Sequence, residues 1–402
     1  MHPPSRMLLA AALLCACSQG GKETRPQSDV RIAAIHHLFG FRALRGFGTF
    51  PVSPDVSFPD RSTLSLTDRS TYTITRSGAT SGEDDYALAQ NGALSILVHG
   101  GSGEPTVAFP GGYGLVSAAN ADLFFVDRFS TPASPSVGLF FGARVVQGIP
   151  DLSGGWHLLS QHLIFSSSTL LSTGNVARGA HGGISIATGT PGDPLAISGT
   201  GTESTRVSLV FGGTAQALAQ GSTGDGTMNL TISYQDSLQP PGTADSRVLV
   251  AAAGEDIVYA VDQDESDGEA GIVLLVRKFD APTTVADPAR AAGTYLLGAQ
   301  TFFVDPMNSG ADAAIGTLLL TAQGAFRIDM IGSQGIDFAY SGTFSLGQDG
   351  GMTLSVDGTN ETWFGAIRRD YNTVAVIDDF VETRNNPELN LFFGVREKQT
   401  AQ

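Results

Sequence analysis

One pattern recurs three times in this 402-residue chain: a tight turn followed by a strand of alternating apolar residues. The turns are Asn91-Gly92, Asp225-Gly226 and Asp349-Gly350. The apolar positions that follow them are Leu94, Ile96 and Val98, then Met228, Leu230 and Ile232, then Met352, Leu354 and Val356. Asn-Gly and Asp-Gly favour two-residue hairpin turns, and a period of two is typical of a half-buried strand. The pattern therefore predicts antiparallel hairpins rather than helices.

Two further features flank each turn in the same order. Each unit opens with glycine, any residue and an aromatic: Gly48-Thr49-Phe50, Gly154-Gly155-Trp156 and Gly293-Thr294-Tyr295. Each unit closes with an apolar strand that ends in arginine: "SPSVGLFFGAR", "EAGIVLLVR" and "PELNLFFGVR". These marks divide the chain into three units, at 46–147, 153–280 and 291–398.

The third unit shows the pattern most clearly. Its strand candidates are 294–298, 314–321, 325–331, 336–346, 351–357, 362–368, 373–379 and 388–396. Their connections are short, which predicts an antiparallel meander. One face is apolar: Phe326, Ile328, Met330, Phe338, Tyr340, Phe344, Leu346, Met352, Leu354, Val356, Trp363, Ile367, Val374, Val376, Leu389, Leu391, Phe393 and Val395. Such a sheet has to close on itself or pack against another sheet.

We therefore predict an all-β protein of three tandem antiparallel meander repeats, each of about eight strands and each an up-and-down barrel. Closure requires the last strand of each unit to pair with the first. A six-bladed β-propeller with two blades per unit is the alternative, because about 50 residues suit one four-stranded blade.

The opening aromatic and the closing arginine (Arg144, Arg277 and Arg396) resemble the signature of the calycins, the superfamily of lipocalin- and avidin-like barrels. The resemblance covers these positions rather than the whole chain, and the middle unit alone has a tryptophan there. It implies that the arginine packs over the aromatic near one barrel end and that a barrel binds a small apolar ligand. Strand alternation places Arg396 on the opposite face from Leu389, Leu391 and Phe393.

The ligand-binding candidates are Trp156, Tyr295 and Trp363. Each tryptophan falls on a strand face that is already apolar, so a core position is the alternative for both. The middle unit has a Gly- and Ser-rich insertion around 167–182, which makes it the favoured host for a ligand or a lid.

The chain begins "MHPPSRMLLAAALLCACSQGG", in which Arg6 precedes a short apolar run, Met7 to Cys17. A positive start, a short apolar run and a small-residue exit predict a signal peptide, because a spanning helix needs about 20 apolar residues. The exit Leu14-Cys15-Ala16-Cys17 resembles the bacterial lipobox. This resemblance implies a signal peptide over 1–16, lipidation of Cys17, and an outer-membrane location from Ser18. An ordinary signal peptide is the alternative.

Residues 17–45 are expected to form a lipidated tether and a short N-terminal segment. The stretch 18–28 is polar, and Ser28 is a candidate cap for one short helix over the residues that follow. With Cys17 as the acyl anchor, the lipid bilayer is the first expected partner.

Charge and motifs exclude several functions. Lys and Arg number 23 against 39 Asp and Glu, a net charge of -16, so nucleic acid is not an expected partner. "VHGGSG" at 98–103 resembles an esterase oxyanion loop, but no Gly-x-Ser-x-Gly elbow accompanies it. "DQDESDGE" at 262–269 has its glycine one position late for a calcium loop. His157 and His162, five positions apart on one strand, should face opposite sides. We expect no catalytic residue, no metal site and no cofactor.

The sequence thus predicts a non-enzymatic lipoprotein on the outer membrane, at its periplasmic or cell-surface face. Its barrels bind a small apolar ligand or act as an envelope scaffold. The alternative is a surface interaction protein that recognises envelope proteins or glycans through its loops.

Overall fold

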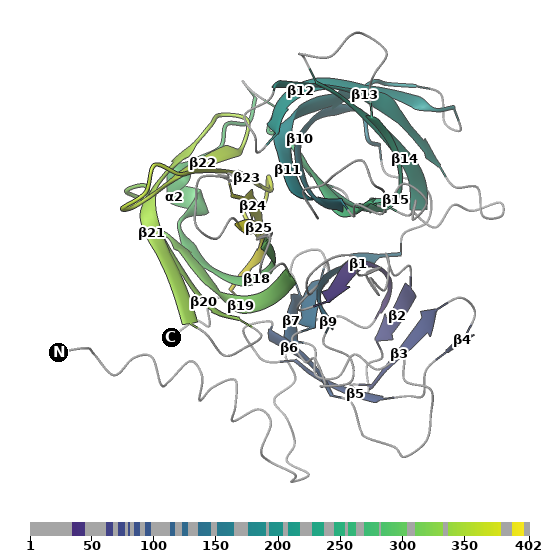
Figure 1. Cartoon of the computed structure of the whole chain (residues 1–402), viewed down its shortest axis with the longest axis horizontal. Coiled ribbons are helices and arrows are strands. Elements are labelled where there is room, and N and C mark those ends of the chain that lie inside the picture. The colour runs from purple at the N-terminus through teal and green to yellow at the C-terminus, as the bar shows by residue number, and fades with distance from the viewer. Residues whose placement is uncertain are drawn as a thin grey trace.

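The computed structural model describes residues 34–44, 62–66, 71–76, 79–80, 84–88, 93–97, 113–116, 123–127, 136–145, 151–164, 176–189, 193–203, 208–217, 227–236, 245–253, 256–262, 269–280, 283–303, 310–332, 337–378 and 388–397. These residues are almost entirely β-strand, and one short helix, α2 (Pro288–Ala291), lies among them. The predicted all-β class is confirmed. Figure 1 shows three groups of strands arranged around a common centre.

The first group is a nine-stranded sheet, which we call the N-terminal sheet. Its strands are β1 (Ala34–Leu44), β2 (Ser62–Leu66), β3 (Thr71–Arg76), β4 (Ala79–Thr80), β5 (Asp84–Leu88), β6 (Ala93–Leu97), β7 (Tyr113–Val116), β8 (Leu123–Asp127) and β9 (Ser136–Arg144). The order is β2-β1-β9-β8-β7-β6-β5-β3-β4, and β2 also pairs with β3. The last strand, β9, pairs with the first, β1, from His36↔Arg144 to Leu44↔Ser136.

The second group is a closed barrel, the middle barrel. Its strands are β10 (Gly154–Ile164), β11 (Val176–Ile186), β12 (Leu195–Glu203), β13 (Ser208–Ala217), β14 (Thr227–Asp236), β15 (Asp245–Ala253), β16 (Ile257–Asp262) and β17 (Glu269–Arg277). Every strand pairs antiparallel with the next, and β17 returns to pair with β10. This is the predicted meander with the predicted closure.

The third group, the C-terminal barrel, is closed in the same way. Its strands are β18 (Gly293–Phe303), β19 (Gly310–Leu320), β20 (Ala325–Gly332), β21 (Asp337–Leu346), β22 (Gly351–Val356), β23 (Thr362–Ile367), β24 (Thr373–Ile377) and β25 (Glu388–Arg396). They match the predicted strands one for one. The propeller alternative is wrong for both closed barrels, because each ring is joined edge to edge by β10–β17 or β18–β25 pairing. That the three units are repeats of one another stays a prediction.

Side chains from around each ring fill the two barrels. The middle-barrel core comprises Leu152, Trp156, Leu158, Ala180, Ile184, Ile186, Ile197, Leu209, Phe211, Ala215, Met228, Leu230, Ile232, Leu249, Ala251, Val258, Ala260, Val273 and Leu275. The C-terminal-barrel core comprises Phe279, Ala286, Ala291, Tyr295, Leu297, Ala299, Ala314, Leu318, Leu320, Phe326, Ile328, Met330, Phe344, Met352, Leu354, Val356, Trp363, Ile367, Tyr371, Val374, Val376 and Phe392. Eight strands make a ring just wide enough for such side chains to fill.

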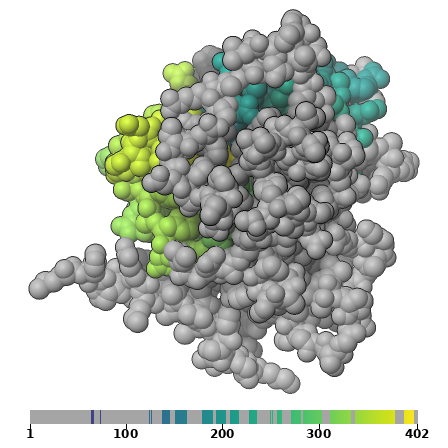
Figure 2. All heavy atoms as spheres, in the orientation of Figure 1, coloured from purple at the N-terminus to yellow at the C-terminus, as the bar shows by residue number. Residues whose placement is uncertain are grey.

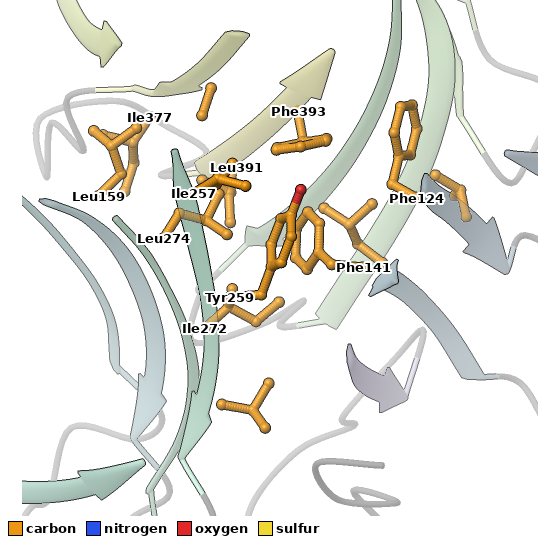
Figure 3. Close-up of a cluster of buried hydrophobic side chains, with 14 of the residues drawn as sticks. Phe124, Phe141, Leu159, Ile257, Tyr259, Ile272, Leu274, Ile377, Leu391 and Phe393 are labelled. Carbon is orange, nitrogen blue, oxygen red and sulfur yellow. The ribbon is translucent and has the colours of Figure 1, made fainter. Parts of the chain in front are cut away.

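A third apolar cluster lies outside the barrels, where the three groups meet, and we call it the junction. It takes side chains from β8 and β9, from β16 and β17, and from β24 and β25, among others. Phe141 of the N-terminal sheet stacks on Tyr259 of the middle barrel, with ring centroids 5.2 Å apart. Phe393 of the C-terminal barrel meets both rings edge-on, at 5.0 and 5.9 Å (Figure 3). One aromatic ring from each group therefore meets the other two within the junction.

The junction explains why the closing strand is apolar in all three units. On β25, Phe392 belongs to the barrel core, whereas Leu389, Leu391, Phe393 and Val395 belong to the junction. The prediction that these four point into the barrel is wrong. A strand that is buried on both faces is apolar at every position, so alternation cannot show which face is inside.

The N-terminal segment also requires a correction. Residues 34–44 form β1, not part of the short helix predicted after Ser28. They lie before the expected start of the first unit at residue 46. β1 pairs with β9 along most of its own length, and this pairing explains why the segment is a strand. The long-range backbone hydrogen bonds outweigh a weak local cap signal.

Candidate functional site

The aromatic residue and the arginine predicted to pack together do so in the middle barrel. The Arg277 guanidinium carbon lies 4.3 Å from the ring centroid of Trp156. The same guanidinium donates to the carbonyl oxygens of Ser153, at 2.8 Å, and Asp151. The Trp156 indole N–H donates to the carbonyl of Leu152, at 2.8 Å. Arg277 thus ties the last strand to the segment that precedes the first.

The C-terminal barrel repeats this arrangement position for position. The Arg396 guanidinium carbon lies 5.9 Å from the ring centroid of Tyr295. It donates to the carbonyls of Arg290, at 2.9 Å, and Ala292. The Tyr295 hydroxyl donates to the carbonyl of Ala291, at 2.9 Å, four residues upstream, as the indole does in the other barrel. Burial raises the pKa of Tyr295, so this hydroxyl stays protonated.

The glycines of the opening motifs in the two closed barrels are required by the backbone conformation. Gly154 and Gly293 have φ of +115° and +154°, a region that L side chains rarely adopt. A Cβ on Gly293 would also lie 2.9 Å from the guanidinium of Arg396. Glycine, aromatic and arginine therefore act together to close one end of a barrel.

The third ligand-binding candidate, Trp363, lies inside the C-terminal barrel. It stacks on Phe392 at 5.3 Å between centroids and meets Tyr340 edge-on at 4.7 Å. Its indole N–H donates to a carboxylate oxygen of Glu361, at 3.2 Å. Like Trp156 and Tyr295, this ring is buried, and a protein group satisfies its polar atom.

Further predicted features fall partly or wholly outside the described residues. Cys17, the lipidation candidate, lies outside them, as do 98–103 and most of the acidic stretch 262–269. Within the described ranges, no group of three or more His, Cys, Asp or Glu side chains is placed to hold a metal ion. No helix in the described part of the chain is long and apolar enough to cross a membrane.

The two closed barrels are joined by an ionic cluster around one aspartate. Arg369 of the C-terminal barrel places its Nε 3.0 Å from Asp256 Oδ1 and its Nη1 3.0 Å from Asp280 Oδ2. Arg277 and Arg368 approach the same Asp256 carboxylate at 3.6 and 3.9 Å. Burial and the neighbouring Arg369 lower the pKa of Arg277. The arginine that closes the middle barrel thus also contacts the interface with the next barrel.

Two histidines on the outside of the middle barrel contact the C-terminal barrel. His157 Nε2 donates to the carbonyl of Asp349, at 2.9 Å, and Lys278 Nζ lies 3.1 Å from the carboxylate of the same residue. His181 stacks on Phe364 with centroids 3.6 Å apart. Burial lowers the pKa of both histidines, that of His181 to about 4, so both are neutral at pH 7.

His157 and His162 face opposite sides of β10, as predicted. His162 lies edge-on to Tyr234, which packs against the middle-barrel core, at 5.9 Å between centroids. Sequence reasoning did not find the junction or the ionic cluster, because both join residues from different units.

No protein-family model matches the sequence, and no curated protein matches it significantly. Solved structures of transferrin-binding protein B show a distant likeness. A double mutant of this protein from Haemophilus parasuis Hp5 is 8% identical, with a TM-score of 0.32, over 91% of this chain and 76% of that chain. Intact Ap-TbpB (N and C lobes) is 10% identical, with a TM-score of 0.31, over 91% and 77%. The isotype 1 protein from serogroup B Neisseria meningitidis is 9% identical, with a TM-score of 0.29, over 90% and 76%. At these scores the likeness carries no inference about what this chain binds.

Proposed function

We propose that this chain is a non-enzymatic lipoprotein, anchored to the outer membrane through acylated Cys17, that recognises an envelope protein or glycan through the outside of its barrels. Its three units are repeats of one calycin-like barrel plan, and the first of them lies in the N-terminal sheet. The polar stretch 18–28 is the tether between anchor and body.

The filled barrel interiors carry this proposal. Each closed barrel is packed with apolar side chains, including Trp156 in one and Trp363 in the other. A small-molecule site is typically a concave pocket with a few convergent polar groups. Here the indole and phenol polar atoms bond to the protein's own carbonyls and carboxylate. These contacts favour recognition outside the barrels over a small apolar ligand inside them.

The junction restricts which outer surfaces are open to a partner. The outer faces of β9, β17 and β25 pack against one another and are buried. The strands on the far side of each ring and the loops therefore have to provide the binding surface.

One experiment tests the anchor. Wild-type chain expressed in a Gram-negative bacterium should incorporate a labelled fatty acid and sediment with the outer membrane. The variant Cys17→Ser should do neither, whereas Cys15→Ser should behave as wild type, since Cys15 is not the proposed acylation site. Equal labelling of wild type and Cys17→Ser would contradict the anchor.

A second experiment tests recognition. Purified Cys17→Ser chain, which lacks the anchor, should still co-sediment with isolated envelopes of a related bacterium in a saturable way. A folded chain that shows no saturable binding to envelopes would contradict the proposed interaction role.

A further inference from the structure

The outer face of β12, β13 and β14 in the middle barrel carries no charged side chain. We define this surface, the neutral face, by its outward residues: Ala196, Ser198, Thr200, Thr202, Ser208, Val210, Gly212, Thr214, Gln216, Asn229, Thr231, Ser233 and Gln235. Charged residues make up 15% of the chain, so thirteen outward positions would carry about two on average, whereas the neutral face carries none.

The strand registers arrange these residues in rows across the three strands. One row is Thr200, Val210 and Gln235, and another is Ala196, Thr214 and Thr231. Between them lies the row of smallest side chains: Ser198, Gly212 and Ser233. Adjacent strands are about 4.8 Å apart, so the rows form a regular array of short hydroxyl and amide groups.

This face is on the side of the middle barrel away from the other two groups. Figure 1 shows β12 and β13 at the far edge of the molecule, and Figure 2, in the same orientation, shows teal atoms of this barrel at the surface on that side. The outward side chains of β13 are mostly exposed, and Val210 is 47% exposed. The neutral face is therefore accessible in the part of the chain that the structure describes.

We propose that the neutral face binds an uncharged, hydroxyl-rich polysaccharide. Serine and threonine hydroxyls both donate and accept, and glutamine and asparagine amides offer both groups on one side chain. Sugar hydroxyls need both functions, so this set is complementary to a neutral glycan. Val210 supplies an apolar contact for the C–H face of a sugar ring.

The composition argues against other macromolecules. Cores of protein interfaces are enriched in aromatic residues, methionine and arginine, none of which lies on the neutral face. Nucleic acid and anionic lipid require clustered positive charge. Short β-branched side chains on paired strands also lose little conformational freedom on binding.

The corresponding face of the C-terminal barrel shows that the fold does not demand neutrality. Its outward residues on β20, β21 and β22 include Arg327 and Asp329, which form an ion pair at 2.7 Å, and Asp337, beside uncharged serines and threonines on β21 and β22. The middle-barrel face differs in that it lacks charge on all three strands.

This inference rests on the proposed interaction function. A binding assay tests it with two insoluble neutral polysaccharides, cellulose and amylose, and with alginate as an acidic comparison. Purified Cys17→Ser chain should be depleted from solution by at least one neutral polysaccharide and not by alginate. The variant Thr200→Glu/Thr214→Glu should bind at least tenfold more weakly, because each carboxylate would lose water against an uncharged surface. The matched control, Thr343→Glu/Ser345→Glu on exposed β21, should bind within twofold of the parent.

A melting temperature within about 2 °C of the parent would show that each variant is folded. A second variant on the same face, Ser198→Arg, should also bind more weakly than the parent. Absence of binding to both neutral polysaccharides, or equal binding by the neutral-face variants, would overturn the inference. If these variants still sediment with envelopes as the parent does, the interaction function stands and the neutral face is not its site. If the parent itself does not bind envelopes, the proposed function fails first.

Discussion

The middle barrel and the C-terminal barrel are closed by the same device but differ in what they present and enclose. Both use a glycine, an aromatic ring and an arginine at equivalent positions. Outside, one barrel has the neutral face and the other has the Arg327–Asp329 pair. The two barrels therefore share the side-chain contacts at one end, whereas their outer strand surfaces differ.

The interiors of the two closed barrels are packed by different side chains. In the middle barrel, a Cβ on Gly182 or Gly201 would lie 2.7 or 2.5 Å from the ring of Phe211. Glycine on two neighbouring strands lets that ring approach the backbone of both. In the C-terminal barrel, Trp363 and Phe392 stack on one another instead. Large and small side chains are thus arranged differently in two rings of the same strand number, and each arrangement fills its ring as close packing requires.

The largest expected effect on stability comes from a change in the junction, which both closed barrels share. Phe393→Ala removes the ring that contacts Phe141 and Tyr259 in the junction and should lower the free energy of unfolding by about 3–5 kcal/mol. Urea unfolding followed by tryptophan fluorescence measures the change. Leu319→Ala, at a position 43% exposed, is the control and should change it by about 0.5 kcal/mol or less. A loss below about 1 kcal/mol for Phe393→Ala would mean that the junction does not hold the groups together.

The next largest effect is expected for His181, at the contact between the two closed barrels. The pKa of His181 falls from 6.5 to about 4 on burial, so its contribution to stability is complete above pH 6.5 and is lost as the pH falls toward 4. Between pH 8 and pH 5 the loss should be about 2 kcal/mol. Burial also lowers the pKa of His157, so this residue too should lose stability as the pH falls.

The variant His181→Gln isolates this effect. Unfolding titrations at several pH values should show a shallower acid loss than wild type, whereas both proteins should follow parallel curves above pH 7. An acid loss of the same size in the variant would show that other groups cause it.

A third effect compares the two closing arginines. Arg277→Met and Arg396→Met each leave two backbone carbonyls without their donor, at a cost of about 1–3 kcal/mol. We expect the larger loss for Arg277, because its guanidinium lies closer to its aromatic ring and also faces Asp256. Thermal unfolding of both variants gives the order. The conservative Arg277→Lys should recover little, since lysine lacks the planar fork. The reverse order would contradict a stabilising role for the closer ring contact and for Asp256.

The smallest effect is expected on the charged face of the C-terminal barrel. Arg327→Ser removes an exposed ion pair with Asp329 and should change the free energy of unfolding by less than about 0.5 kcal/mol. The wild-type and variant values should converge further in 1 M salt, which screens surface charges. A salt-insensitive loss above about 1 kcal/mol would show that this face is structural, and the contrast with the neutral face would weaken.

Much of the fold could be predicted because local signals coincide with it. Turn dipeptides such as Asp349-Gly350 and the alternation after them specify hairpins, and all the strands of the C-terminal barrel were placed from such signals. Arg396 was correctly placed on the opposite face of its strand from Leu391 and Phe393, since alternation is a local property.

What could not be predicted depends on contacts between units. Leu391 and Phe393 looked like barrel interior because the junction that buries them includes residues more than 100 positions away, such as Phe141 and Tyr259. β1 was missed because its pairing with β9 is long-range and its sequence, "AIHHLFGFRAL", lacks a clear turn signal. The neutral face is visible in the sequence as Thr- and Ser-rich strands, but three-strand register is needed to see it as one surface.

Native mass spectrometry of residues 29–402, expressed without the anchor in a related bacterium and purified gently, tests most directly whether recognition occurs outside filled barrels. Barrels filled by their own side chains should give the mass of the bare chain under conditions that keep a control lipid carrier loaded. Extra mass in discrete steps that disappears on denaturation would contradict it, since an occupied barrel would make Trp156, Tyr295 or Trp363 ligand contacts after all.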